Sequence, residues 1–328
     1  MNLPPVYACQ WSPLGNPALS FMNAFSESVH EAESKHRDLL PDLRRGSMMF
    51  IASDYSGQHD QARYESLAFL LADLEQCGEW EGRRKALRRK YLSDNRRVSY
   101  KNLNDKKRRS ALVPFLAAAN SIPGLVATIL IDKRVGSLFS PTGHLEMDDL
   151  QLQEYAHWNR TSLEKLLRVI HFVSFFIAGL SRPHQNILWI TDEDDIVPNE
   201  QRLREAVKLF SNVSGHYLKH EMGHFRWGTT KSDDGTRQLE DLVSVTDLVA
   251  GALSHMLASY EKDGVFPSSN LIIPPPRGMP RKSIEIMNWF ADHTQPLKRL
   301  VYIIRPVEGS TFLSLKHLWF HGLVDFQG

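Results

Sequence analysis

The sequence of 328 residues contains only two cysteines, Cys9 and Cys77, and has no cysteine pair at zinc-ligand spacing. Two cysteines cannot form a disulfide framework, so we expect a reducing compartment and a cytoplasmic location. The N-terminus lacks the basic region and apolar stretch of a signal peptide. The longest apolar run, 166–180, contains Arg168 and His171 and is shorter than the ~20 residues that cross a bilayer, which predicts a buried core helix and no membrane contact.

Several catalytic motifs are missing as well. The chain has no glycine-rich loop of the P-loop or dinucleotide-binding type, no serine in a G-x-S-x-G frame, and no internal repeat. Its composition, 42% hydrophobic and 23% charged residues, is that of a folded globular protein. Any catalytic activity of the chain therefore has to depend on side chains outside these motifs.

The pattern of apolar runs predicts an α/β fold. Strand-like runs alternate with helix-like runs, which favours a central mixed sheet flanked by helices. We expect strands at 47–53, 124–133, 186–190 and 223–230, a short strand at 96–101, and helices at 105–120, 163–180, 199–213 and 239–260. The run 64–74 is ambiguous between a strand and a helix.

Proline-rich stretches divide the chain into three parts. Residues 1–46 are expected to form an N-terminal extension with a helix at about 18–40, and residues 47–263 the main domain. Residues 264–328 begin with a proline-rich linker, followed by a helix (282–293) and a hairpin (297–320) that we expect to pack on the main domain. A protein partner or a second copy of the chain would bind through one of these two extensions.

Three aspartates stand where core elements should end or where a carboxylate is unexpected. Asp54 and Asp192 each follow a predicted strand, and Asp247 lies among apolar neighbours in a predicted helix. Strand ends at one edge of an α/β sheet converge on a common crevice. Carboxylates that meet there repel one another unless a cation neutralises them, and oxygen-only ligands favour Mg²⁺ or Mn²⁺. The alternative is that these acids are helix caps or loop residues with no role in binding.

These acids lie in motifs that resemble a known family. Asp54-Tyr55-Ser56-Gly57 and Thr246-Asp247-Leu248-Val249-Ala250-Gly251, with a strand ending at Asp192 between them, look like the ribonuclease-H-like domain-of-unknown-function family numbered thirty-eight hundred. The resemblance covers about 48–257 and implies a ribonuclease-H-like mixed sheet with metal-binding roles for Asp54, Asp192 and Asp247. Tyr55 departs from the usual Glu, and the helix-borne Glu of ribonucleases H has no clear counterpart, with Glu193, Asp194, Asp195 and Asp241 as the candidate substitutes.

A second motif, His220-Glu221-Met222-Gly223-His224, matches the H-E-x-x-H pattern of zinc peptidases. On a helix this spacing places both imidazoles on one face with the Glu as general base. Gly223 inside the motif and the strand-like residues after it argue against a helix here. A Zn²⁺-dependent peptidase therefore remains an alternative.

A strongly basic segment runs from Arg83 to Arg109. It contains thirteen Lys or Arg against Asp94 and Asp105, so the segment is +11 within a chain of net charge +1. Such a field attracts polyanions, although a charge run is also typical of a solvated helical face. The cations that we expect to be exposed and to contact nucleic acid are Arg83, Arg84, Lys85, Arg88, Arg89, Lys90, Arg96, Arg97 and Lys101.

Together these features predict a metal-dependent nuclease. Two bound ions would activate the attacking water and stabilise the leaving oxygen, and the basic segment would hold the nucleic-acid backbone. The alternatives are the zinc peptidase, a non-catalytic nucleic-acid-binding protein that kept the fold, and an interaction protein whose acids are structural.

Overall fold

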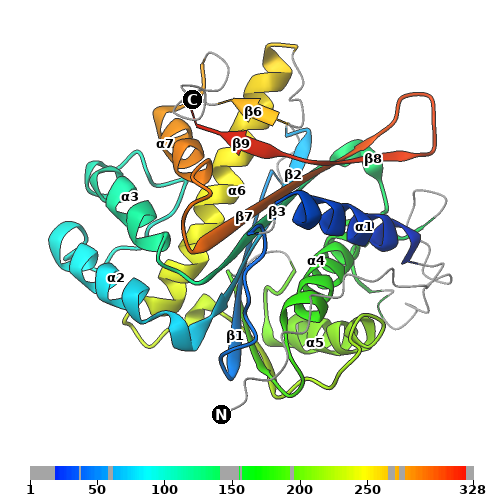
Figure 1. Ribbon diagram of the computed structural model, residues 1–328, viewed down its shortest axis with the longest axis horizontal. Coiled ribbons are helices and arrows are strands. Elements are labelled where there is room, and N and C mark those ends of the chain that lie inside the picture. Colours follow the sequence, from blue (N-terminus) through cyan, green and yellow to red (C-terminus); the bar gives the residue numbers. More distant parts are fainter. Residues whose placement is uncertain are drawn as a thin grey trace.

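The computed structural model describes residues 19–36, 38–57, 62–140, 155, 157–192, 196–264, 270–272 and 278–322. Within them the chain is an α/β protein with a seven-stranded mixed sheet flanked by seven helices (Figure 1). The strands of the sheet are β1 (Met48–Ser56), β2 (Tyr64–Asp73), β3 (Gly124–Asp132), β4 (Asn186–Thr191), β5 (Phe225–Thr229), β7 (Leu297–Pro306) and β8 (Leu313–His317). This confirms the predicted α/β class.

The strand order is β5-β4-β1-β2-β3-β7-β8. The first three strands of the chain form an antiparallel meander, and β4 and β5 continue the sheet beside β1 in the same direction as β1. On the other side β7 is parallel to β3, and β8 is antiparallel to β7. The carboxyl ends of β1, β4 and β5 therefore lie at one edge of the sheet, as parallel pairing requires.

The helices form two layers (Figure 1). Their bounds are α1 (Ser20–Lys35), α2 (Gly78–Tyr91), α3 (Lys106–Ala119), α4 (Arg160–Leu180), α5 (Glu200–Ser214), α6 (Gln238–Lys262) and α7 (Arg281–Phe290). Apolar side chains of α2, α3, α6 and α7 share one core with the sheet, and those of α1, α4 and α5 share the other. Covered on both faces, the central strands can be apolar throughout, which is why the ambiguous run became β2, with every residue buried.

Helix α6 is long and apolar enough in composition to cross a membrane, and 72% of its apolar window is buried inside the protein. It crosses the face of the sheet over β1 and β2. The apolar run that we predicted as a core helix is α4, whose Leu166, Phe172 and Phe176 are buried against the other face.

One predicted strand is wrong. Residues 96–101 form no strand, because their backbone is held by side chains of α6: Ser244 Oγ donates to the carbonyl of Val98 at 2.7 Å, and the amide of Tyr100 donates to Asp247 at 2.6 Å. The C-terminal hairpin, expected to pack on the main domain, continues its central sheet through the pairing of β7 with β3. A short parallel pair, β6 (Asn270–Ile272) with β9 (Trp319–His321), lies outside that sheet.

Candidate active site at the sheet edge

The edge where β1 and β4 end brings two of the predicted acids side by side. Ser53 of β1 pairs with Thr191 of β4, so the next residues, Asp54 and Asp192, follow in register on neighbouring strands. Side chains alternate along a strand. Ala52 and Ile190 pack in the core beneath α6, so Asp54 and Asp192, two residues further on, lie on the α6 side of the sheet.

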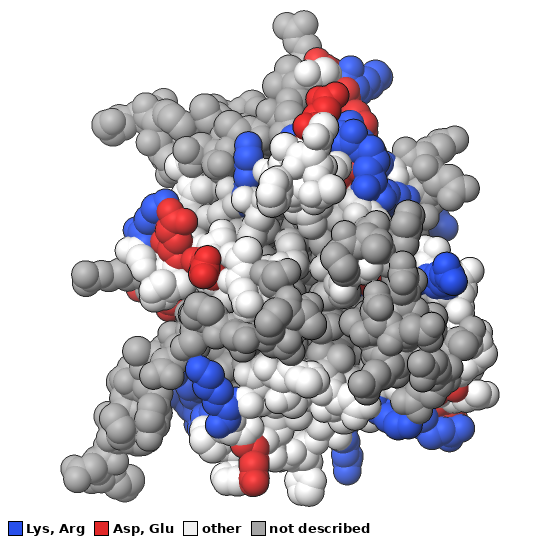
Figure 2. All heavy atoms as spheres, turned by 90° about the vertical axis from the view of Figure 1, so that its right-hand side faces the viewer, with Lys and Arg blue, Asp and Glu red and all other residues white. Residues whose placement is uncertain are grey.

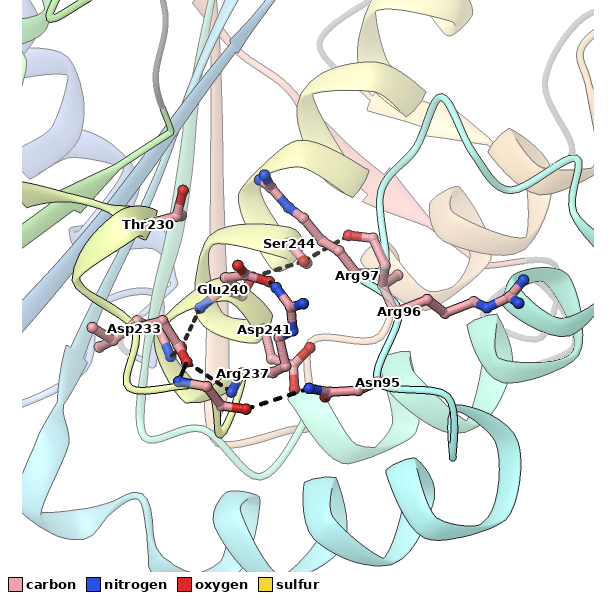
Figure 3. Close-up of polar contacts among 12 residues, drawn as sticks. Asn95, Arg96, Arg97, Thr230, Asp233, Arg237, Glu240, Asp241 and Ser244 are labelled. Atoms are coloured by element: carbon pink, nitrogen blue, oxygen red, sulfur yellow. Dashed lines mark hydrogen bonds and ion pairs between the residues drawn. The ribbon is translucent and has the colours of Figure 1, made fainter. Parts of the chain in front are cut away.

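Helix α6 supplies the third acid, and its first turn is anchored firmly. Asp233 accepts hydrogen bonds from the amides of Leu239 at 2.8 Å and Glu240 at 3.3 Å, which satisfies donors that the start of a helix leaves unpaired (Figure 3). From this start the helix runs across the sheet edge, and Asp247 lies in its third turn. The anchored first turn therefore fixes the position of Asp247 along α6 relative to the strands.

The segment between α2 and α3 closes over α6. Asn95 Nδ2 donates to the carbonyl of Gly235 at 3.4 Å, and farther along the segment Val98 and Tyr100 are bound to α6 as described above. Arg96 and Arg97 leave this segment in opposite directions (Figure 3). Arg96 pairs with Asp94 and Asp105, away from the sheet edge, whereas Arg97 reaches over α6 toward it.

Arg97 binds Asp192 with both ends of its guanidinium. Nη1 lies 3.0 Å from Oδ1 and Nη2 lies 2.6 Å from Oδ2, which is the strong bidentate geometry of an arginine–carboxylate pair. Thr230, just after β5, donates its hydroxyl to the same Oδ1 at 3.0 Å. Asp192 is thus held by a guanidinium and a hydroxyl, among its other contacts.

Asp247 is ionised less easily than an ordinary aspartate. Burial raises its pKa to about 6, and the charge of Asp192 pushes in the same direction, whereas the amide of Tyr100 and the charges of Arg97 and Lys282 oppose the rise. The two carboxylates therefore interact, and one guanidinium serves both. We call Asp54, Asp192, Asp247 and Arg97 the edge cluster.

The ligand chemistry of the edge cluster fits a hard divalent cation, because it offers carboxylate oxygens alone. Its geometry fits only in part. Within the described residues, no three His, Cys, Asp or Glu side chains are arranged to hold a metal ion, and Arg97 engages both oxygens of Asp192. Glu193, one of the predicted ligands, lies outside the described residues.

Asp241, predicted as a further metal ligand, instead binds two arginines inside the protein. Arg88 donates Nε to Asp241 at 2.6 Å, and Arg84 donates Nη1 at 3.0 Å. The side chains of Asp241 and Arg84 are each 1% exposed. We call these three residues the Asp241 cluster. Both of its oxygens accept hydrogen bonds from buried guanidiniums, so a metal role for Asp241 would require these ion pairs to break.

The same contacts correct the picture of an exposed basic face. Arg84 and Arg88 are buried and cannot reach a phosphate, and Arg97 faces the sheet edge. Arg83 and Lys85 are exposed but pair with Glu79 and Glu81, which stand on the same helix. The exposed cations of the segment for which the described residues include no carboxylate partner are Arg89, Lys90, Lys101, Lys106 and Arg109.

These five cations lie on α2, on α3 or between them, on the left of Figure 1. Figure 2 views the molecule from the opposite side. The described Lys and Arg side chains visible there stand in small, separate groups, several of them beside Asp or Glu. The basic segment therefore remains the place to look for a polyanion.

The H-E-x-x-H motif does not form a helix. His220 to His224 lie in a turn and an extended stretch that lead into β5. His220 Nε2 is 3.0 Å from the hydroxyl of Ser181, and Glu221 lies beside His184 at the exposed surface. The two imidazoles are therefore not presented from one helical face, as a zinc peptidase requires.

Sequence reasoning missed the groups that hold the acids in place. Arg97 was assigned to nucleic acid and is the partner of Asp192, while Thr230 and the Tyr100 amide received no role. A signal was present for Arg97 only, because the buried acids of an α/β edge need a counter-charge.

No protein-family model matches the chain, and no curated protein is significantly similar to it in sequence.

Proposed function

We propose that this chain is a metal-dependent nuclease of the ribonuclease-H-like kind, with its active site at the edge cluster. One observation carries the proposal. Two neighbouring parallel strands carry Asp54 and Asp192 in register at one edge of the sheet, and the buried Asp247 of α6 interacts there with the charge of Asp192. A buried acid whose pKa is raised beside a second carboxylate is typical of functional sites.

The strand arrangement supports the same reading. An antiparallel meander of three strands, with two further strands added parallel to the first, is the arrangement of ribonuclease-H-like sheets, and β3-β2-β1-β4-β5 has it. Fold likeness alone does not establish an activity, so the acids have to carry the chemistry. The additional strands β7 and β8 lie at the far side of the sheet from β4 and β5.

A divalent cation bound here would lower the pKa of an attacking water and stabilise the charge that develops on the phosphate oxygens. Asp54, Asp192 and Asp247 are the residues that would hold it. The Tyr100 amide, at 2.6 Å, fixes the orientation of Asp247, and the Thr230 hydroxyl fixes that of Asp192. Lys101, next to Tyr100, and Arg109 on α3 would bind the flanking phosphates.

The test is a cleavage assay with end-labelled single-stranded and duplex RNA and DNA, in Mg²⁺, Mn²⁺ or EDTA. We expect cleavage of at least one substrate that requires the metal and falls at least 100-fold in Asp54→Asn and in Asp247→Asn. His220→Ala should remain as active as the unmodified protein. Equal cleavage by the acid variants, or cleavage that EDTA leaves unchanged, would refute the proposal.

A second candidate is a nucleic-acid-binding protein without catalysis. The bidentate contact of Arg97 with Asp192 favours it, because a guanidinium that stays there supplies the positive charge a metal would otherwise bring. In that case the same oligonucleotides would bind with an affinity that is independent of Mg²⁺, and none would be cleaved.

A further inference from the structure

A pocket of about 200 Å³ lies along α6, beyond Asp247. The helix contributes Gly251, Ser254 and Ala258 to its lining, and these small residues recur every three or four positions, so they share one face of the helix. Asp247 precedes Gly251 by four residues and belongs to the same face. The pocket therefore continues from Asp247 toward the end of α6.

The strands β1 and β2 contribute the facing side of the pocket. Ser56 lines it from the end of β1, two residues after Asp54 and therefore on the same side of the sheet. Arg63, just before β2, lines it as well and is bound at two points, because Nε donates to Asp132 at 3.1 Å and Nη1 to Glu261 at 2.9 Å. The strand periodicity thus places the pocket next to Asp54 as well as next to Asp247.

Tyr100 forms a fixed wall between the pocket and the edge cluster. Its amide donates to Asp247 at 2.6 Å, its hydroxyl shares a hydrogen bond with that of Ser283, and Lys282 Nζ lies 4.2 Å from the centre of its ring. A β-carbon at Gly251 would lie 2.3 Å from Tyr100 Cγ, so only glycine lets the ring pack this closely against α6. Contacts within the protein hold this wall, so a ligand does not have to order it.

The pocket also contains polar groups that a ligand can reach. The hydroxyls of Ser56 and Ser254 are partly exposed and have no hydrogen-bond partner among the described residues. His255 is exposed, and its Nδ1 lies 3.1 Å from the carbonyl of Gly251. Because a carbonyl only accepts, Nδ1 carries the proton, and the neutral ring leaves Nε2 as an acceptor. The pocket therefore offers both donors and acceptors to the edge of a bound molecule.

Size and charge favour a flat, uncharged ring as that molecule. At about 200 Å³ the pocket is smaller than the ~300–1,000 Å³ sites of drug-sized ligands, so it suits a single ring system. The charged side chains in its lining, Arg63 and Glu261, pair with each other and leave no uncompensated cation for a phosphate. Tyr64, Tyr100 and His255 add aromatic rings to the lining. A nucleobase combines a face for aromatic contacts with donors and acceptors along its edge.

We propose that this pocket binds one unpaired base of a single-stranded nucleic acid, next to the phosphate at the edge cluster. A base within a duplex has its hydrogen-bonding edge occupied by its partner and its faces by its neighbours, so it enters such a pocket only when it is flipped out. This inference rests on the proposed function and narrows its substrate to single strands. Base binding itself uses the pocket alone and requires no metal.

The test measures affinity by fluorescence anisotropy in EDTA, so that no metal takes part. The probes are a labelled 2′-O-methyl phosphorothioate decanucleotide of alternating adenosine and cytidine, the same strand without bases, and a short DNA duplex. The strand with bases should bind about tenfold more tightly than the abasic strand, because base contacts add to the same phosphate contacts. Ser254→Leu, which fills the pocket from α6, should remove this difference and leave the affinities for the abasic strand and the duplex unchanged.

Ser259→Leu is the matched control, because it makes the same change on α6 at a position that does not line the pocket. It should bind all three probes as the unmodified protein does. Ala258→Leu, at an exposed pocket position, repeats the test if Ser254→Leu does not fold.

The outcomes separate the pocket from the proposed activity. Equal affinity of the unmodified protein for the two strands, or a tenfold difference that survives in Ser254→Leu and Ala258→Leu, overturns base binding and leaves the nuclease proposal intact. Base-dependent binding without metal-dependent cleavage supports the pocket and refutes the nuclease. Binding of no probe, even at low salt, refutes both.

Discussion

Two clusters of acids and arginines tie the same basic segment to the rest of the protein, and they are built differently. In the Asp241 cluster two arginines surround one carboxylate, and Asp241 and Arg84 are each 1% exposed. In the edge cluster one arginine serves two interacting carboxylates, and Asp192 and Arg97 are about one-third exposed at 32% and 28%. The Asp241 cluster is closed, and its charges balance because Arg84 also pairs with Glu81, whereas the edge cluster is open and has a surplus of negative charge.

The difference separates a structural ion cluster from a candidate binding site. A buried carboxylate needs counter-charges to be stable inside the protein, and both oxygens of Asp241 already accept hydrogen bonds from arginines. The edge cluster retains a carboxylate whose charge is incompletely neutralised, which is the condition that attracts a cation. Acids of this chain therefore have to be judged by their partners rather than by their position in a motif.

The largest expected effect comes from breaking the closed cluster. Asp241→Asn removes the carboxylate that Arg84 and Arg88 share, and it leaves the buried guanidinium of Arg88 without a carboxylate partner among the described residues, while Arg84 keeps Glu81. We expect the free energy of unfolding to fall by about 3–5 kcal/mol, the usual cost of removing one partner from a buried ion pair. Urea unfolding followed by circular dichroism measures it.

Arg83→Gln serves as the control for that substitution. Arg83 and its partner Glu79 are 53% and 61% exposed, and such a pair contributes at most about 1 kcal/mol. If Asp241→Asn costs no more than Arg83→Gln, the Asp241 cluster does not hold the segment in place.

A smaller effect is expected from Asp247→Asn, and it depends on pH. The pKa of Asp247 is raised from 3.8 to about 6, so the folded protein holds this proton more tightly than the unfolded chain does. The resulting stabilisation is present at low pH and is lost as the pH rises through 6. Between pH 4.5 and 7.5 the loss is about 2 kcal/mol, since one pKa unit corresponds to about 1.4 kcal/mol.

Asparagine does not titrate, so Asp247→Asn should remove that part of the pH dependence and should be more stable than the unmodified protein at pH 7.5. Urea unfolding at the two pH values provides the comparison. Asp263→Asn, an exposed position just after α6, controls for the loss of one negative charge. The same pH dependence in Asp247→Asn and in the unmodified protein would mean that Asp247 is not perturbed.

The smallest effect on stability is expected from the exposed cations. Replacing Arg89, Lys101, Lys106 and Arg109 with Gln should change the free energy of unfolding by less than about 0.5 kcal/mol. It should weaken nucleic-acid binding. It should also flatten the slope of the logarithm of the binding constant against the logarithm of the salt concentration, by about 0.9 for each lost contact on duplex DNA and about 0.7 on single strands. Fluorescence anisotropy at several salt concentrations measures both.

The control replaces four exposed cations on the α5 and β5 side, which are Arg204, Lys208, Lys219 and Arg226. It should leave the affinity for nucleic acid and the salt dependence of that affinity unchanged. Equal losses in the two sets would show that only the total charge matters, and the basic segment would then have no special role.

Much of the fold could be predicted from the sequence because local runs of apolar residues indicate its strands and helices. Apolar runs marked β1, β3 and β4, and acids at the ends of β1 and β4 marked the edge where they meet. The run that became β2 was ambiguous, since a strand covered on both faces shows no alternation. The pairing of β7 with β3 joins residues more than 150 positions apart, which no local pattern reveals.

The partners of the basic segment could not be predicted for the same reason. Arg97 meets Asp192 across 95 positions and Arg88 meets Asp241 across 153. The segment contains few acids of its own, so it was interpreted as an exposed face, although its counter-charges come from β4 and α6. Burial turned Arg84 and Arg88 into structural residues, and only the three-dimensional arrangement decides this.

The central claim is that the edge cluster binds a divalent cation, and titration calorimetry of Mn²⁺ tests it most directly. The proteins to compare are the unmodified chain, the double variant Asp54→Asn/Asp247→Asn, and His220→Ala as the control, each with a non-cleavable 2′-O-methyl phosphorothioate decanucleotide present. We predict saturable binding to the unmodified protein and to His220→Ala, and at least tenfold weaker binding to the double variant. Equal affinity in all three proteins, or tight Zn²⁺ binding that only His220→Ala loses, would contradict the account.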